Sequence, residues 1–206
     1  GHLDAVEIDR DLAAQLAKDF PPGSGLDLHV GDALTFDFAA LAALRGARLR
    51  IVGNLPYNIS TPLLFHLLET PAQHLDLHVM LQREVIERMA AAPGSKDYGR
   101  LTVMLAPWAR VEKLFDVGPG AFQPPPRVWS SVARLTLRAT PAFDVPANFA
   151  GLVASAFSQR RKTLRNALKT LLSAAEIQAV GVDPGARAAV TPPAGFAALA
   201  RAAAQR

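Results

Sequence analysis

Six short apolar runs, alternating with helical or loop segments over the first 140 residues, constrain the fold of this chain more than any other feature. We predict strands over these runs, at 3–9, 26–30, 49–53, 75–81, 111–117 and 131–137. Helical spacing appears between them, at 9–18, 63–68, 84–92 and 98–108. Strands that alternate with helices indicate a parallel sheet with crossover connections, so we predict the α/β fold class.

Polar residues follow the first three runs. Glu7 ends the first, Asp32 follows the second in a Gly-Asp-Ala turn, and Asn54 follows the third. Ligands of such sheets bind beyond the carboxyl ends of the strands, so we expect these three side chains to converge on one crevice. A carboxylate suits ribose hydroxyls at Glu7 and an adenine amine at Asp32. Each signal alone is weak, because Asp9 is a natural helix N-cap and Gly-Asp is an everyday turn.

The third run ends abruptly in Asn54-Leu55-Pro56-Tyr57, and residues 60–62 then give a helix-start signal. An Asn side chain and a backbone carbonyl can accept hydrogen bonds from an exocyclic amine, while an aromatic ring covers the base that carries it. The segment therefore suits the binding of a nucleobase. An ordinary strand-to-helix turn is the alternative interpretation.

The composition changes after Arg138. Two prolines interrupt residues 139–146, and the chain from 147 onward is rich in Ala and Leu at helical spacing. We place a domain boundary near residue 141, with an α/β domain over 1–140 and a small all-helical domain over 141–206. The helical part carries a basic group that suits RNA phosphates, or simply forms a solvated helix face. Its members are Arg160, Arg161, Lys162, Arg165 and Lys169.

Composition narrows the function classes. The absence of Cys excludes disulfides and thiolate metal sites, and the scattered His residues form no ligand set, so we predict no metal. No apolar run approaches the roughly 18 to 20 residues that span a bilayer, and we expect a cytoplasmic protein with no membrane contact. Ser130-Ser131 lies in no Gly-x-Ser-x-Gly elbow, which argues against a hydrolase. The formal charge of +4, with 17 Arg among the 22 cations, is compatible with nucleic-acid binding.

Taken in order, these motifs resemble those of S-adenosylmethionine-dependent N6-adenine methyltransferases. More narrowly, nearly the whole chain is similar to the ribosomal RNA adenine dimethyltransferase family. The segments that carry this similarity are 6–9, 31–34, 54–60, 81–85, 122–128 and 157–166. The similarity is greatest to bacterial members that dimethylate N6 of two adjacent adenosines near the 3′ end of 16S ribosomal RNA. It implies a Rossmann-like class I methyltransferase sheet, a small helical RNA-binding domain, and a monomer that acts on the 30S subunit or its precursor.

The resemblance also implies roles for individual residues on the cofactor side. Glu7 would hold the ribose of S-adenosylmethionine, and Asp32 would hold its adenine amine. Three further residues would line the cofactor pocket, namely Ile8, Ala33 and Asn54.

On the target side, Asn54 and the carbonyl of Leu55 would hold the target amine, and Pro56 would keep the turn rigid. Tyr57 would stack on the flipped base, and Phe122 would supply a second aromatic wall. Two acceptors on the amine favour a pyramidal nitrogen aimed at the methyl group, so orientation replaces a general base. The RNA-binding set implied by the family is Arg127, Arg160, Arg161, Lys162 and Arg165.

The beginning of the chain departs from the family pattern. Members of the family start their sheet with a strand and a Gly-rich turn around the cofactor, whereas Gly1-His2 leads directly into the strand at 3–9. If that segment is absent from the molecule, we expect the second and third strands of the sheet to lose a neighbour, and S-adenosylmethionine to bind weakly or not at all.

Other functions remain open. One is an RNA-binding or ribosome-assembly module without turnover, and another is a methyltransferase that acts on 23S ribosomal RNA or on DNA. The basic segment 157–166 favours the small-subunit enzyme. Leu55, which stands where DNA enzymes usually have a second Pro, argues against the DNA enzymes.

Overall fold

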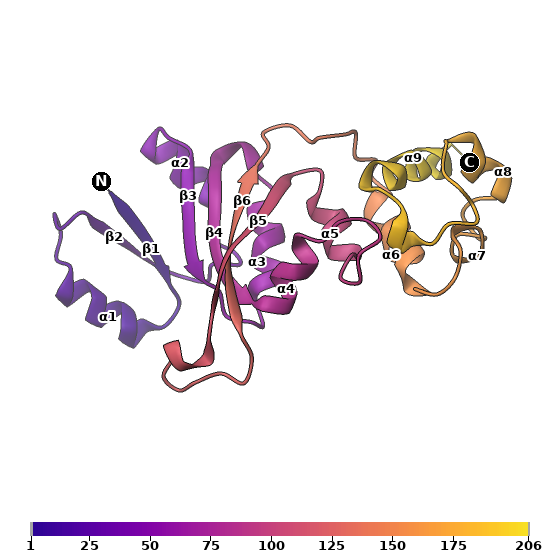
Figure 1. Cartoon of the computed structure of the whole chain (residues 1–206). Coiled ribbons are helices and arrows are strands. Elements are labelled where there is room, and N and C mark those ends of the chain that lie inside the picture. The colour runs from indigo at the N-terminus through magenta and orange to yellow at the C-terminus, as the bar shows by residue number, and fades with distance from the viewer. Residues whose placement is uncertain (1, 206) are drawn as a thin grey trace.

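The computed structural model describes residues 2–205 (Figure 1). Strands and helices alternate in its first part, which comprises β1 (Leu3–Glu7), α1 (Arg10–Asp19), β2 (Leu26–Val30), α2 (Phe38–Arg45), β3 (Leu49–Asn54), α3 (Ser60–Leu67), β4 (His74–Gln82), α4 (Arg83–Met89), α5 (Arg100–Leu105), β5 (Ala109–Val117) and β6 (Ser130–Leu137). Four helices follow, namely α6 (Phe149–Ser158), α7 (Leu164–Ala167), α8 (Ala174–Ala179) and α9 (Pro193–Ala204). Short 3₁₀ turns lie at Pro71–Gln73 (η1), Pro119–Ala121 (η2) and Ala188–Val190 (η3).

The strands form two sheets. β1 and β2 pair in parallel, and the second sheet has the order β3-β4-β6-β5. β3 is parallel to β4, whereas β6 runs antiparallel to both β4 and β5. The α/β class is therefore confirmed, and the expectation of a parallel sheet is wrong for β6. Apolar patterning alone does not reveal this, because it is the same for either strand direction.

No backbone ladder joins β1 to β3 within residues 2–205, and Figure 1 shows β1, β2 and α1 set apart from the larger sheet. Within residues 2–205, β1 pairs only with β2 and β3 pairs only with β4, so each has an open edge. The expected loss of a neighbour for the second and third strands stays a prediction.

The first hydrophobic core lies on one face of the larger sheet, where Figure 1 shows α3, α4 and α5. Alternate residues of β4 point into it, and Leu77, Val79 and Leu81 are buried. They pack with Leu64 of α3 and Ile86 of α4, which are also buried. One face of β4 and the apolar faces of α3 and α4 thus form a single core. This core holds the carboxyl ends of β3 and β4 in place.

A second core forms among the helices of the carboxyl-terminal part. Phe149, Leu164 and Phe196 of α6, α7 and α9 are buried in it. Tyr98 and Val103, which precede residue 141, belong to the same core, and the Tyr98 hydroxyl donates to the Thr191 carbonyl at 2.8 Å. The boundary near residue 141 stays a prediction, because residues on both sides of it share this core.

Helix ends follow their capping residues. Asp9 caps α1 by accepting the N–H groups of Asp11 at 2.9 Å and Leu12 at 3.1 Å. The sequence analysis did not predict α2, although Asp37 caps its start and Gly46 ends it in a left-handed conformation with φ of 62°. No helix within residues 2–205 combines the length and the apolar character needed to span a membrane.

Candidate active site

Asn54 ends β3 with its side chain exposed and its neighbours fixed. It lies in register with Met80 of β4, and the N–H of Leu55 donates to the Met80 carbonyl at 3.2 Å. The Leu55 side chain is buried in the first core. A Cβ at position 53 would lie 2.8 Å from Cδ2 of Leu55, so Gly53 provides the space that this side chain occupies. The hydrogen bond to β4 and the buried Leu55 side chain therefore fix the backbone next to Asn54, while the Asn54 side chain is exposed.

The turn that follows presents Tyr57. The N–H of Ile59 donates to the Pro56 carbonyl at 3.1 Å, and the hydroxyl of Ser60 donates to the Tyr57 carbonyl at 3.1 Å. The Tyr57 ring is 44% exposed, and its hydroxyl lies 3.3 Å from Oγ of Ser130. Ser130 is buried at the start of β6. The ring is thus tethered at its far end while much of its surface stays free.

Glu7 and Asp32 lie side by side at the ends of β1 and β2. Oε1 of Glu7 accepts the N–H of Asp9 at 2.8 Å, and Oδ1 of Asp32 accepts the N–H of Leu34 at 2.9 Å. The N–H of Gly31 donates to the Glu7 carbonyl at 2.9 Å, which joins the two strand ends. Within residues 2–205, the second oxygen of each carboxylate has no hydrogen-bond partner, so both can accept from a ligand.

The remaining predicted residues lie around this edge. Ile8 follows β1 with its side chain exposed, and Ala33 packs against the first core. Phe122 is half-buried directly after η2, and its N–H donates to the Pro119 carbonyl at 3.2 Å. Figure 1 shows β1 and β3 pointing the same way, so their carboxyl ends lie at one edge. In the described part of the chain, no hydrogen bond joins Glu7 or Asp32 to Asn54 or Tyr57.

Ser130 is a residue that sequence reasoning did not place in the site. Ser130-Ser131 served there only as an argument against a hydrolase. In the structure, Ser130 contacts Tyr57 across 73 residues of sequence, while the hydroxyl of Ser131 donates to Asp116 at 2.5 Å. The only signal for this contact in the sequence is a pair of serines at the start of an apolar run.

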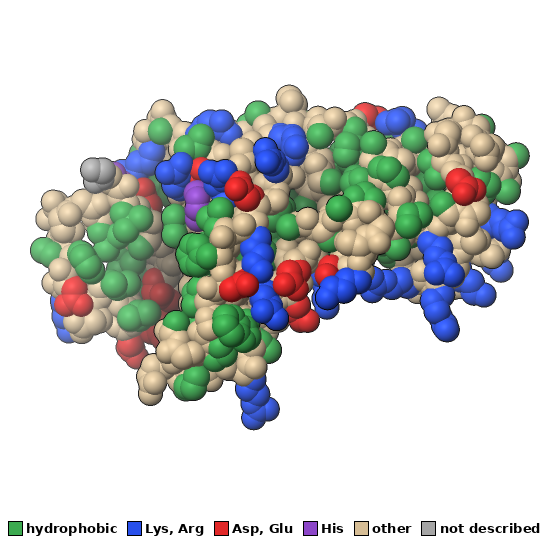
Figure 2. Space-filling view, viewed as in Figure 1, with side chains coloured by type: hydrophobic (Ala, Val, Ile, Leu, Met, Phe, Trp, Pro, Cys, Tyr) green, Lys and Arg blue, Asp and Glu red, His purple; other side chains and the backbone are tan. Residues whose placement is uncertain are grey.

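The basic group does not lie on a single helix face. Arg160, Arg161 and Lys162 occupy the turn between α6 and α7, and of the group Arg165 lies within α7. The Arg160 guanidinium donates to the Lys96 carbonyl, which ties this turn to the α/β part. The others are exposed, and Figure 2 shows Lys and Arg side chains along the lower edge of the helical part. Arg127 is also exposed, in the loop before β6.

Acidic and basic side chains cluster at the opposite ends of β1 and β2. Arg45 of α2 binds Asp4 at 2.6 Å and also binds Asp27. His2 and His29 contact Asp4 as well, at 3.7 Å and 2.8 Å. Hydrogen bonding by Arg45 lowers the pKa of Asp4 to about 2. His2, Asp4 and Asp27 resemble a ligand set in spacing, but the Arg45 guanidinium already donates hydrogen bonds to both carboxylates.

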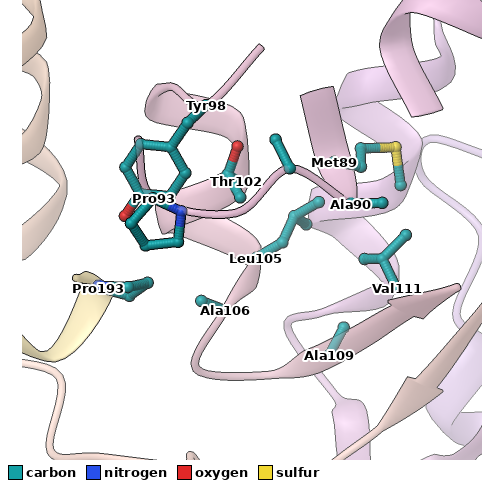
Figure 3. Close-up of a pocket in the computed structure, with 11 residues that line it drawn as sticks. Met89, Ala90, Pro93, Tyr98, Thr102, Leu105, Ala106, Ala109, Val111 and Pro193 are labelled. Carbon is teal, nitrogen blue, oxygen red and sulfur yellow. The ribbon is translucent and has the colours of Figure 1, made fainter. Parts of the chain in front are cut away.

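A cavity of about 190 Å³ lies near the junction with the helical part (Figure 3). Met89, Leu105 and Val111 line one side, and Tyr98 and Pro193 line the other. It contains none of the predicted site residues. The candidate active site is instead an open edge of the sheets, and the cavity belongs to the packing between the two parts.

An α/β sheet with acids after its first strands and Asn-Leu-Pro-Tyr at the end of the next defines a Rossmann-like methyltransferase. The fold is shared with a dimethyladenosine transferase from Plasmodium falciparum, with a TM-score of 0.80 at 22% identity over 96% of this chain and 80% of that one. It is also shared with the 23S rRNA methyltransferase ErmE, with a TM-score of 0.69 at 25% identity over 99% of this chain and 82% of that one.

The sequence comparison defines the group further. The family model for ribosomal RNA adenine dimethylase matches residues 2–205, and the chain belongs to this family. Relatives named ribosomal RNA small subunit methyltransferase A include one from Thiobacillus denitrificans, 56% identical over 91% of this chain and 72% of the relative. Another, from a Burkholderia species, is 54% identical over 98% of this chain and 73% of the relative.

Proposed function

We propose that this chain transfers methyl groups from S-adenosylmethionine to N6 of two adjacent adenosines near the 3′ end of 16S ribosomal RNA. The observation that carries the proposal is the Asn54–Tyr57 turn, in which an exposed amide is followed three residues later by a tethered, half-exposed aromatic ring. The relatives named for the small subunit favour this substrate over large-subunit RNA. The protein would work in the cytoplasm as a monomer.

The chemistry assigned to Asn54 and Leu55 is orientation. The amide oxygen of Asn54 and the carbonyl of Leu55 would accept the two hydrogens of the target amine. An aromatic amine is a poor nucleophile because its lone pair is delocalised into the ring. Holding both hydrogens aims the lone pair at the methyl donor, and orientation of this kind can supply effective molarities of up to about 10⁵ to 10⁸ M.

Tyr57 and Phe122 would hold the base itself. A flipped adenosine loses its stacking neighbours, and aromatic side chains replace them. Tyr57 has the exposure that such a contact needs, and its link to Ser130 limits how far the ring can swing.

The cofactor would lie on Glu7 and Asp32. S-adenosylmethionine supplies the methyl group when bound. The free carboxylate oxygen of Glu7 suits the ribose hydroxyls, and that of Asp32 suits the adenine amine. Ile8 and Ala33 would line the same pocket. The donor set thus fits the adenosine part of the cofactor.

RNA would cross both parts of the chain. Arg127 is exposed in the loop that leads to Ser130 at the start of β6. The residues Arg160, Arg161, Lys162 and Arg165 would extend the basic surface onto the predicted helical domain from residue 141 onward. Such contacts position the RNA through its phosphates and do not read its sequence.

The proposal is tested by methyl incorporation into unmethylated small ribosomal subunits. Asn54→Ala should lower kcat by about 100-fold, the size expected when a reacting group loses its alignment. Gln73→Ala, which removes an exposed amide at the other end of the sheet, is the matched control and should be unchanged. Equal activity of the Asn54 variant and wild type would refute the role of Asn54, and absence of transfer by wild type would refute the proposed reaction.

A further inference from the structure

The two tryptophans of the chain have opposite environments. Trp108 packs against the first core, as a large aromatic side chain usually does. Trp129 belongs to neither core and is 49% exposed. Gly118 lies against its ring, where a Cβ would come within 3.5 Å of the ring carbons. A large aromatic surface is thus supported from one side and left open to solvent.

Arg83 adds a second planar group. Its guanidinium carbon lies 5.7 Å from the centre of the Trp129 ring, which is a cation–π contact. The N–H of Arg83 also donates to the Trp129 carbonyl at 2.9 Å, so backbone and side chain hold the two residues together. The Arg83 side chain itself is 45% exposed. The pair therefore presents aromatic and guanidinium surfaces, both of which stack on nucleobases.

The pair lies at the same edge of the sheet as the candidate active site. Ser130, the residue after Trp129, contacts the Tyr57 hydroxyl, and it pairs in register with Gln82 of β4. Arg83 follows Gln82 directly. Because consecutive Cα atoms are about 3.8 Å apart, the backbone of Trp129 lies next to the residue that contacts Tyr57, and the backbone of Arg83 lies next to that residue's strand partner. Figure 2 shows hydrophobic side chains gathered at this end of the β5–β6 hairpin.

The charges around the pair favour the face of a base over a phosphate. Glu87 lies 3.6 Å from Arg83 and 3.9 Å from Lys113, and Asp116 lies 2.8 Å from Lys113. These carboxylates balance the nearby cations and would repel a phosphate group. A neutral, flat ring meets no such repulsion, and it gains stacking and cation–π contacts.

We propose that Trp129 and Arg83 form a stacking site for the nucleobase next to the target adenosine in the RNA strand. This inference rests on the proposed function, because it takes Tyr57 to hold the flipped base. The site would bind a base through its face, with little preference among bases, and would fix the strand on one side of the flipped nucleotide.

Fluorescence provides a test that does not need turnover. In the Trp108→Phe variant, Trp129 is the sole tryptophan, because the chain has only two. A short single-stranded RNA with two adjacent adenosines flanked by purines should quench this fluorescence. The same RNA with abasic flanking positions should bind without the quenching, since the phosphates remain but the stacking bases are gone. Quenching that is equal for both RNAs, or absent for both, would overturn the stacking site.

Kinetics on unmethylated small subunits provide the second test. Trp129→Ala should raise KM about 5- to 150-fold, the range expected for loss of one stacked base, whereas Trp129→Phe should restore most of it. Leu44→Ala removes an exposed side chain from α2 and serves as the matched control. An unchanged KM for Trp129→Ala, with the fold verified by circular dichroism, would refute the site. Base-dependent quenching in a protein that transfers no methyl would refute the proposed function and still support stacking.

Discussion

At the residue scale, the orientation of Tyr57 depends on one hydrogen bond outside its own turn. The Tyr57 hydroxyl and Oγ of Ser130 are 3.3 Å apart, and Ser130 is buried in the start of β6. A half-exposed ring without such a tether would sample several rotamers. Stacking of a base would then select one of them, at a cost in side-chain entropy. Under the proposed function, Ser130 would therefore be a positioning residue for Tyr57.

We predict that Ser130→Ala and Tyr57→Phe each lower kcat/KM about 2- to 12-fold, the range that one net hydrogen bond gives. The double variant should lose no more than either single variant, because both remove the same bond. Initial rates of methyl transfer at several subunit concentrations measure this. Ser131→Ala removes the neighbouring hydroxyl, which bonds Asp116 and not Tyr57, and is the control. Additive losses would contradict the shared bond.

Local sequence was enough to locate some of these residues and not others. It placed Asn54 and Tyr57 at the end of a strand, and the structure confirms that location, because strand, turn and helix signals lie within ten residues of one another. It did not relate Ser130 to Tyr57, nor Arg83 to Trp129. Those contacts depend on the order of β4 and β6 in the sheet, which no local pattern specifies.

At the element scale, the two sheets differ in how well their strands are supported. β4 has a partner on each side and a buried face, whereas β1 and β2 have only each other. A two-stranded sheet is marginally stable by itself, so the contacts of α1 and of Arg45 must contribute to holding β1 and β2.

Hydrogen exchange should show this difference. We predict that backbone amides of β1 and β2 exchange much faster than those of β4 and β6, because local opening of the small sheet leaves the first core intact. Mass spectrometry of peptides from each strand measures the rates. Protection of the β1 and β2 peptides equal to that of β4 would show that the sheets open as one unit.

The pH dependence of the small sheet should follow Asp4. Its pKa is lowered to about 2, mainly by the Arg45 hydrogen bond, from the ordinary value of 3.8. A lowered pKa means that the ion pair stabilises the fold fully above about pH 4 and that this contribution is lost as the pH falls toward 2. We predict that the protection of β1 and β2 amides, taken relative to the exchange rate of the unfolded chain at each pH, falls over that interval in wild type. Asp4→Asn should exchange fast already at pH 6, and a wild-type rate at pH 6 in that variant would contradict the prediction.

The sequence predicted most elements to within a few residues, but it missed α2. The capping signals of α2 were present at Asp37 and Gly46, yet its Ala-rich segment lacks a strong apolar period. Conversely, the helix predicted at 98–108 shortens to α5, because Tyr98 leaves the helix and bonds Thr191 in the second core. A tertiary contact therefore decided the second outcome, whereas the first followed from local capping.

At the scale of the whole molecule, basic residues lie on both parts of the chain. Arg127 lies near the sheet edge, and Arg161, Lys162 and Arg165 are exposed around the start of α7. RNA that contacts both would release counterions from both, so affinity should fall steeply as salt rises.

We predict that Lys162→Ala weakens RNA binding by a similar factor for all sequences. The plot of log K against log salt should become shallower by about 0.7 to 0.9, the contribution of one phosphate contact. Binding of unmethylated small subunits between 50 and 300 mM salt, a range in which such contacts are strongly screened, gives the slope. Arg201→Ala, whose cation is paired with Asp144 at 3.3 Å, is the control. A slope equal to wild type would remove Lys162 from the RNA surface.

The open edges of β1 and β3 have a mechanical consequence for the whole molecule. Glu7 and Asp32 belong to one sheet, and Asn54 and Tyr57 belong to the other, with no backbone ladder between them in the described residues. Within the described residues, the 31–48 connection and the Arg45 ion pairs with Asp4 and Asp27 link the two groups. Under the proposed function, the separation of the two groups would set the distance between the methyl donor and the target amine.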